Sequence, residues 1–229
     1  MRNLRSSGFV LFLCVFAQCA LAQTPMEVDW PVLADPDGQQ FDDPYRDLTK
    51  QQFESLMALA RLQLALRAEL AEEERTDLEK RALDLSQDLQ SQGLDPDWIL
   101  AQREAVAQRR QRAALATNAE LEGEYVELRG YLLVARDIEN GAMVAHLLPD
   151  RGVCMHLPPP LPNQVVKLAI KQLPEPLGAC IAAAVRGRLS AAETRATIPV
   201  FDDTILLWSR WHLEVNEAIT SGIFPAENG

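Results

Sequence analysis

The residues of this chain that could carry chemistry gather in one short segment, residues 152–164, which reads G-V-C-M-H-L-P-P-P-L-P-N-Q. It places a thiol, Cys154, two residues before an imidazole, His156. If this part is extended, alternate side chains point to the same face, so the two groups would lie together. A thiolate and an imidazole are both zinc ligands, and zinc binds three or four such groups. The pair predicts a candidate metal site, to which the chain could add His146, His212 or Asp202.

The same two side chains allow two other interpretations. Cys154 can be a small buried residue or half of a disulfide with Cys180, and His156 a structural residue, which is the more common outcome for short motifs. Alternatively, His156 could lower the pKa of the thiol and make Cys154 the nucleophile of a thiol-dependent enzyme. The sequence contains no C-x-x-C motif, catalytic triad or phosphate-binding loop. We therefore expect a protein that is not an enzyme.

Four prolines stiffen the second half of the segment. Proline fixes φ and lacks an N–H group, so the run predicts an extended connector that presents its neighbours. Two amide side chains follow the prolines directly. These amides can bind a partner, or they can satisfy backbone groups that the prolines leave without hydrogen bonds. The candidates for an interaction surface are Pro158, Pro159, Pro160, Asn163 and Gln164.

The first 22 residues have the pattern of a cleavable secretory signal. Two arginines precede an apolar run over residues 9–16, and Ala20-Leu21-Ala22 follows it. The run is shorter than the roughly 20 apolar residues that span a bilayer. Gln18 before Cys19 argues against a lipid anchor. We expect a soluble periplasmic protein that begins at Gln23, with no direct membrane insertion after the signal is removed.

The net charge of the chain limits the classes of partner that it can bind. The net charge is −11 at pH 7, and loss of the two arginines of the signal takes it to −13. An acidic protein is repelled by phosphate backbones and by anionic lipids, so we expect no nucleic-acid partner. Two of the four cysteines leave with the signal. Cys154 and Cys180 remain, which allows at most one disulfide.

Helical periodicity dominates the first half of the exported chain. Residues 23–48 are rich in Pro, Asp and Gly and predict an irregular lead-in that docks through Trp30. Residues 49–119 predict a helical arm, a helical hairpin, in which leucines recur at helical spacing. A capping box at Thr49 and Gln52 marks its start. A second capping box, Thr76 with Glu79, predicts a break near residues 73–75.

After about residue 118 the period changes from helical to alternating. The predicted strands are residues 125–135, 142–148, 165–170, 181–189, 197–201 and 206–213, and a short C-terminal helix follows the last. Gly130 and Gly187 lie inside strands and predict bulges or sharp bends. The fold class is therefore α+β: the helical arm is followed by a small OB-like β-barrel over residues 120–229.

The motif and its flanking strands resemble a known family. Gly130-Tyr131-Leu132, then Leu147-Leu148-Pro149, then G-x-C-x-H-x-P-P-P-x-P-N-Q over residues 152–164 are similar to domain-of-unknown-function family 3299. The later stretch Val185-Arg186-Gly187-Arg188-Leu189 matches a strand of that family. The resemblance covers roughly residues 125–213, and Trp30 is similar to an early tryptophan of the family.

This resemblance implies an accessory role. The family is similar to exported proteins and lipoproteins found near ABC-type export systems, some of them in zinc-responsive settings. Its motif includes Cys154 and has no place for Cys180, which implies two free thiols. We therefore expect an exported, non-enzymatic accessory or binding protein of the bacterial cell envelope, whose partner is an envelope protein such as an ABC transporter component. The alternatives are a periplasmic zinc-binding protein and a thiol-dependent enzyme.

Overall fold

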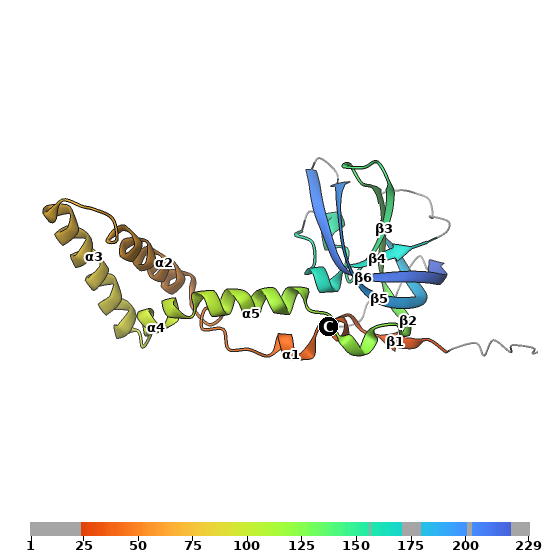
Figure 1. The fold of residues 1–229 in the computed structure, drawn as a ribbon, viewed down its shortest axis with the longest axis horizontal. Coiled ribbons are helices and arrows are strands. Elements are labelled where there is room, and N and C mark those ends of the chain that lie inside the picture. Colours follow the sequence, from red (N-terminus) through yellow and green to blue (C-terminus); the bar gives the residue numbers. More distant parts are fainter. Residues whose placement is uncertain (1–23, 156, 171–179, 201–202, 221–229) are drawn as a thin grey trace, which may run out of the picture.

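The computed structural model describes residues 24–155, 157–170, 180–200 and 203–220. The expected signal, residues 1–22, lies outside these ranges. Figure 1 shows an elongated molecule in which a helical arm extends away from a β domain, and α5 (Arg103–Leu115) connects the two parts. The chain therefore has the expected α+β class. Within the described ranges, none of the helices combines the length and the apolar character that crossing a membrane requires.

Three further helices complete the arm. They are α2 (Lys50–Ala65), α3 (Glu72–Ser91) and α4 (Pro96–Ala101). The predicted capping box is confirmed: Thr49 Oγ1 accepts from Gln52 N at 3.2 Å, and Gln52 Oε1 accepts from Thr49 N at 2.9 Å. The arm has a small core of its own, whose fully buried side chains are Leu56, Leu59, Leu89 and Ile99.

The second predicted capping box is wrong. Thr76 lies inside α3, and its hydroxyl donates to the carbonyl oxygen of Glu72 at 2.8 Å. The break between α2 and α3 lies instead over residues 66–71. Three glutamates, Glu72, Glu73 and Glu74, occupy the first turn of α3, where negative charge is favoured by the helix dipole.

The lead-in packs against the β domain. Its short elements are β1 (Met26–Val28), η1 (Trp30–Leu33) and α1 (Pro36–Gln39). Trp30 Nε1 donates to the carbonyl oxygen of Arg129 at 2.7 Å, so docking through Trp30 is confirmed. Leu33 is fully buried, and its carbonyl oxygen accepts from Trp211 Nε1 at 3.2 Å.

Beyond β1, the described part of the β domain contains the strands β2 (Tyr125–Arg136), β3 (Met143–Leu148), β4 (Val166–Ala169), β5 (Ile181–Val200) and β6 (Asp203–Thr220). The sheet order is β1-β2-β3-β4-β6-β5, and β2 also pairs with β5. All these pairs are antiparallel except β1 with β2 and β4 with β6. Each strand from β3 to β6 therefore has two neighbours, and β2 has three, because it pairs with β1, β3 and β5.

The C-terminal half of the domain differs from the expectation. The two strands predicted over residues 181–189 and 197–201 are one strand, β5, which runs to Val200. The helix expected after residue 213 is wrong as far as Thr220, because β6 continues to that residue. Both strands extend because they pair with each other along most of their length, from Val200 opposite Asp203 back to Ala183 opposite Thr220. Residues 221–229 lie outside the described ranges.

Two glycines allow close approach of strand backbones. A Cβ atom on Gly130 would overlap the carbonyl oxygen of Leu148, and one on Gly187 would overlap that of Glu214. The register between β5 and β6 shifts between Arg186 and Gly187, so the bulge predicted at Gly187 is confirmed.

The sheet buries apolar side chains on both faces. The buried apolar side chains form two clusters, and consecutive residues of β2 belong to different ones. Leu132 belongs to the larger cluster, with Trp211, and Leu133 belongs to the smaller cluster. Val153, from the 3-10 turn η3 (Gly152–Met155), joins the smaller cluster. The chemistry-bearing segment is thus anchored to the second face of the sheet.

Candidate functional site

The segment over residues 152–164 begins and ends with a short turn. The first turn, η3, is followed by η4 (Pro162–Gln164), and Leu157 N donates to the carbonyl oxygen of Gly152 at 2.9 Å. The extended conformation expected from residue 153 to residue 157 is therefore wrong for residues 153–155. A 3-10 turn has three residues per turn, so residues two apart do not share a face.

Cys180 is disulfide-bonded. The expectation of two free thiols is therefore wrong. Cys180 packs against the smaller apolar cluster, which also contains Val153, the sequence neighbour of Cys154. The side chain of Cys154, the predicted ligand or nucleophile, lies outside the described part of the chain, as do His156 and Asp202.

His146, the third predicted metal ligand, is buried on β3. The residue is 1% exposed, and neither ring nitrogen has a hydrogen-bond partner among the described residues. Burial lowers the pKa of His146 to about 4, and the positive charge of Lys167 lowers it as well. The ring is therefore neutral at pH 7, which is the form that binds metals.

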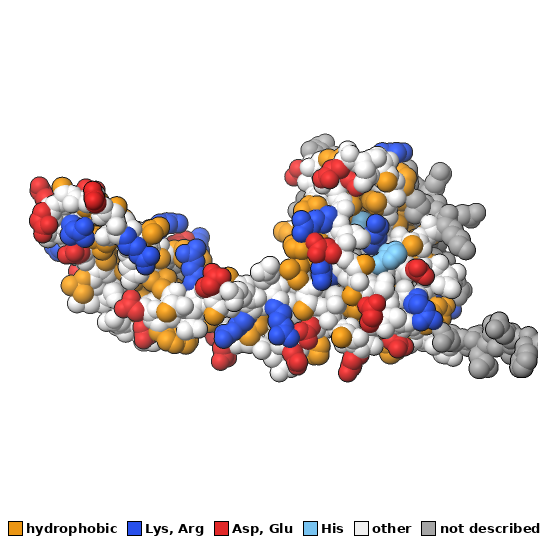
Figure 2. Space-filling model, viewed as in Figure 1, with side chains coloured by type: hydrophobic (Ala, Val, Ile, Leu, Met, Phe, Trp, Pro, Cys, Tyr) orange, Lys and Arg blue, Asp and Glu red, His pale blue; other side chains and the backbone are white. Residues whose placement is uncertain are grey.

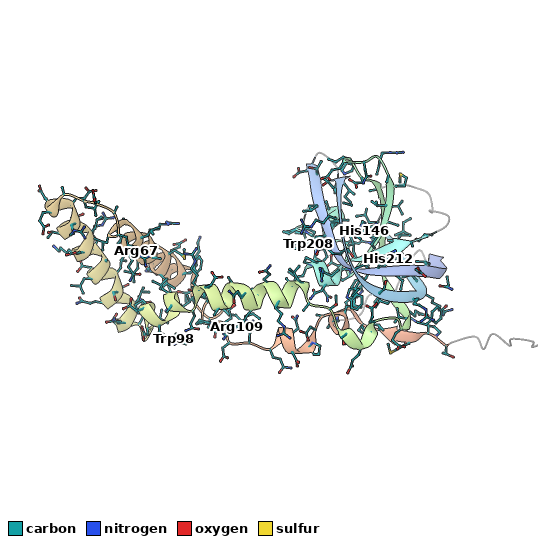
Figure 3. All side chains as sticks on the ribbon, in the orientation of Figure 1. Arg67, Trp98, Arg109, His146, Trp208 and His212 are labelled. Atoms are coloured by element: carbon teal, nitrogen blue, oxygen red, sulfur yellow. The ribbon has the colours of Figure 1, made fainter. Side chains whose placement is uncertain are left out.

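His146 belongs to a row of three basic residues on neighbouring strands. It lies directly opposite Lys167 on β4, and Lys167 lies directly opposite His212 on β6. Side chains of directly paired residues point to the same face, and Figure 3 shows both histidines in the same part of the β domain. The lysine lies between the two histidines, where its charge opposes a bound cation.

The described residues alone do not fit a zinc site. In the described ranges, no three His, Cys, Asp or Glu side chains are close enough together to hold a metal ion. His146 could supply one ligand, because both of its nitrogens lack a partner there. Any contribution of Cys154 and His156 falls outside the part of the chain that the structure describes.

Asn163 lies at the joint between the arm and the β domain. It is fully buried, and its Nδ2 donates to the carbonyl oxygens of Ala113 at 2.7 Å and Ala116 at 2.9 Å. The last carbonyl groups of a helix have no partner within the helix, so this amide caps the C-terminal end of α5. The side chain predicted for an interaction surface thus makes an internal contact.

The other residues of the predicted interaction surface lie nearer the solvent. Pro158 and Pro159 are exposed, whereas Pro160 and Gln164 are half-buried. Gln164 Nε2 donates to the carbonyl oxygen of Asn163 at 3.3 Å. Pro158 and Pro159 are therefore accessible to a partner.

Further contacts stabilise the joint between the arm and the β domain, and no pattern in the sequence predicts them. Arg210 on β6 donates from Nε to the carbonyl oxygen of Leu115 at 3.1 Å. Arg112 on α5 forms an ion pair with Asp35 of the lead-in at 2.8 Å. Such contacts join residues 77 or more positions apart, and single-residue patterns do not encode them.

The arm exposes large apolar side chains that the sequence analysis did not consider. They are Phe53 at 45%, Leu64 at 65%, Leu83 at 57% and Trp98 at 53% exposure. Figure 2 shows hydrophobic side chains on the surface of the arm among charged ones. The sequence of α2 contains more apolar residues at helical spacing than the arm's own core buries. This excess could have indicated an exposed apolar face.

A comparison with models of protein families identifies one family. The family described as "Protein of unknown function (DUF3299)" matches residues 48–202, which includes the arm as well as most of the β domain. The crystal structure of a DUF3299 family protein from Pseudomonas aeruginosa PAO1 is 19% identical, with a TM-score of 0.34, and the match covers 47% of this chain and 68% of that chain. No curated protein matches the chain. Since the family match spans more than half of its residues, this chain belongs to the DUF3299 family.

Proposed function

We propose that this protein is an exported, non-enzymatic accessory protein of the bacterial cell envelope, which binds a protein component of an ABC-type export system. The observation that carries the proposal is the arm. It extends away from the β domain (Figure 1) and exposes large apolar side chains, among them Leu64 and Trp98. Leu64 lines a hollow of the arm together with Leu100 and Ala101. An exposed apolar patch of this kind is typical of protein–protein contact.

Export is supported by the sequence of residues 1–22, which has the charged start, short apolar run and small-residue end of a secretory signal. A disulfide at Cys180 is in keeping with an oxidising compartment such as the periplasm. We expect cell fractionation to recover the protein in the periplasm with Gln23 as its first residue. A chain that keeps residues 1–22, or carries a lipid on Cys19, would contradict this part of the proposal.

We further propose that the β domain is an OB-like barrel. The pairing runs from β2 through β3, β4, β6 and β5, and β5 pairs with β2 again. A closed order of five strands is what a small Greek-key barrel requires. Closure leaves few free strand edges, so a partner has little opportunity to add a strand. This favours the arm, rather than the barrel, as the part that binds the partner.

The arm can be removed without cutting the β domain, which gives a direct test. Asp43 Oδ2 and Arg110 Nε lie 2.7 Å apart, so the chain returns close to its starting point. A Gly/Ser linker of about four residues, which reaches ~13 Å, can replace residues 44–109. We expect an envelope protein to co-purify from the native host with the intact chain and not with the arm-deleted chain. Equal recovery of the same partner with both chains would refute binding through the arm.

A periplasmic zinc-binding protein is the second candidate. The observation in its favour is His146, a buried neutral imidazole whose two nitrogens have no hydrogen-bond partner among the residues that the structure describes. The charge of Lys167 beside it argues in the other direction. Elemental analysis of the protein, isolated without a histidine tag or chelator, tests this candidate. One zinc per chain that is lost in His146→Leu would support it, and a metal-free protein would exclude it.

A further inference from the structure

Helix α2 has two apolar stripes, and the arm's own core uses one of them. Leu56 and Leu59 are fully buried in that core. The second stripe contains residues spaced by four, three and four positions, which places them on one face of the helix. Its ends are 11 positions apart, or about 16 Å at a rise of 1.5 Å per residue. Its members are Phe53, Met57, Ala60 and Leu64.

The second stripe lines two adjoining hollows. The first has a volume of ≈ 260 Å³, and its apolar lining includes Phe53, Met57 and Ala60 of α2 together with Tyr45, Leu100 and Val106. The second has a volume of ≈ 340 Å³ and is lined by Leu64 and Ala101, among others. Ala60, Leu100 and Arg103 line both hollows, so the two form one continuous groove, which we call the arm groove.

Arginines border the arm groove. Arg67 and Arg103 line the second hollow, and Arg103 and Arg110 the first. Arg110 is paired with Asp43 at 2.7 Å. In contrast, the guanidinium groups of Arg67 and Arg103 have no ion pair or hydrogen bond with another described residue, and both residues are exposed.

The charge of the arm groove is opposite to that of the protein as a whole. Its lining residues include three arginines and one carboxylate, Asp97. The whole chain has a net charge of −11. Figure 3 shows Arg67 near the C-terminal end of α2. A local positive rim on an acidic protein favours an acidic partner, while the overall charge disfavours extended anionic surfaces such as membranes and nucleic acids.

We propose that the arm groove binds an acidic amphipathic helix of a protein partner. The proposal rests on the function proposed above and specifies the chemistry of the partner. A groove of about 16 Å accommodates three turns of a helix. Apolar side chains at positions i, i+4 and i+7 of the partner would lie on the second stripe of α2. Carboxylates beside them would pair with Arg67 and Arg103 at the rim.

The test uses the full exported chain and three synthetic peptides of about 14 residues. The first peptide has leucines at i, i+4 and i+7 and glutamates elsewhere, with a hydrocarbon staple that keeps it helical. The second replaces the glutamates with lysines, and the third replaces the leucines with glutamines. We expect the first peptide to bind at least tenfold more tightly than either of the others, as measured by fluorescence anisotropy at about 0.15 M salt, where charges more than about 8 Å away are screened and the nearby arginines dominate.

Two pairs of variants identify the binding surface. Arg67→Glu combined with Arg103→Glu should weaken the acidic peptide about tenfold, whereas Arg81→Glu on α3, outside the groove, should leave it unchanged. Leu64→Ser should also weaken binding, and Leu83→Ser, a similarly exposed leucine on α3, should not. Circular dichroism spectra of all variants should match that of the unaltered chain, because these side chains are exposed.

Other results would overturn the proposal. Equal affinity for the acidic and lysine peptides would show that the arginines do not select the partner. Equal loss in the groove variants and in their controls would place the site elsewhere. Dimers that dissociate only in the Leu64→Ser variant would show that a second copy of the chain fills the groove. If the arm-deleted chain loses its envelope partner while Arg67→Glu with Arg103→Glu keeps it, the arm binds but the groove does not.

Discussion

Acidification should destabilise this protein through one buried side chain, His146. Its pKa falls from 6.5 to about 4 because burial disfavours the charged ring, and Lys167 adds to the effect. The carboxylate of Asp137 acts in the opposite direction but does not outweigh the other two. The folded chain therefore holds the neutral ring, whereas the unfolded chain takes up a proton below pH 6.5. The stability that depends on the neutral ring is fully present above pH 6.5 and is lost as the pH falls toward 4.

The size of the loss follows from the two pKa values. Each unit of difference is worth about 1.4 kcal/mol between the two protonation states. For pKa values of 6.5 and about 4, the free energy of unfolding should fall by about 2 kcal/mol between pH 7.5 and 5.0. This window avoids the buried Glu127 carboxylate, whose lowered pKa removes stability only when the pH falls below its ordinary value of 4.5.

Urea unfolding at pH 7.5 and 5.0, followed by circular dichroism, measures this difference. His146→Leu replaces the ring with an apolar side chain of similar size that does not titrate. It should remove most of the pH dependence of the free energy of unfolding in this window. His212→Gln, in the same row of residues but only half-buried, is the matched control and should retain it. The reasoning is refuted if the free energy of unfolding of His146→Leu falls as much between pH 7.5 and 5.0 as that of the unaltered chain. It is also refuted if the unaltered chain is as stable at pH 5.0 as at pH 7.5.

Three further predictions concern Asn163, the disulfide of Cys180 and Glu127. Asn163→Ala removes two hydrogen bonds to the end of α5 and should cost about 1–3 kcal/mol of stability by urea unfolding. Peptide mapping of the unreduced protein should join the peptide that contains Cys180 to the one that contains Cys154. Reduction should then cost roughly 3–4 kcal/mol for a loop of this size, and a link to another cysteine would contradict the pairing. Glu127→Gln should destabilise the chain by about 2–3 kcal/mol in thermal unfolding, because two arginine side chains donate to this buried carboxylate.

Local signals in the sequence located the elements of the fold well. The capping box at Thr49 and the bulge at Gly187 each depend on neighbouring residues or on one backbone constraint. Trp30 stood out as a large apolar residue in a stretch rich in Pro, Asp and Gly, although its partner, Arg129, lies far away in the sequence. One local signal failed, the second capping box, because Thr76 lies inside α3. The errors in the β domain occur where pairing over a distance decides the outcome. β6 continues past residue 213 because β5 pairs with it, and no pattern within residues 214–220 indicates this.

The candidate site was harder to predict, because its side chains are used in ways that spacing does not encode. The C-x-H spacing predicts a shared face only in an extended segment, and η3 is a tight turn. Asn163 was predicted either to bind a partner or to satisfy backbone groups near the prolines, whereas its partners are carbonyl groups about 50 residues earlier in the chain. The arm groove depends on how α2 packs against α4 and α5, although the second apolar stripe of α2 was visible in the sequence.

The way in which the lead-in is attached shows that the arm is inserted into the β domain rather than placed before it. Asp35 N donates to the carbonyl oxygen of Ala116 at 3.1 Å, and Asn118 N donates to that of Leu33 at 3.0 Å, so the two stretches that flank the arm run side by side. Leu33 is fully buried in the core of the β domain. A chain cut near residue 120 would therefore lose part of that core, although the change of periodicity at this point suggests a boundary. Removal of residues 44–109 preserves the core, because both flanking stretches stay in place.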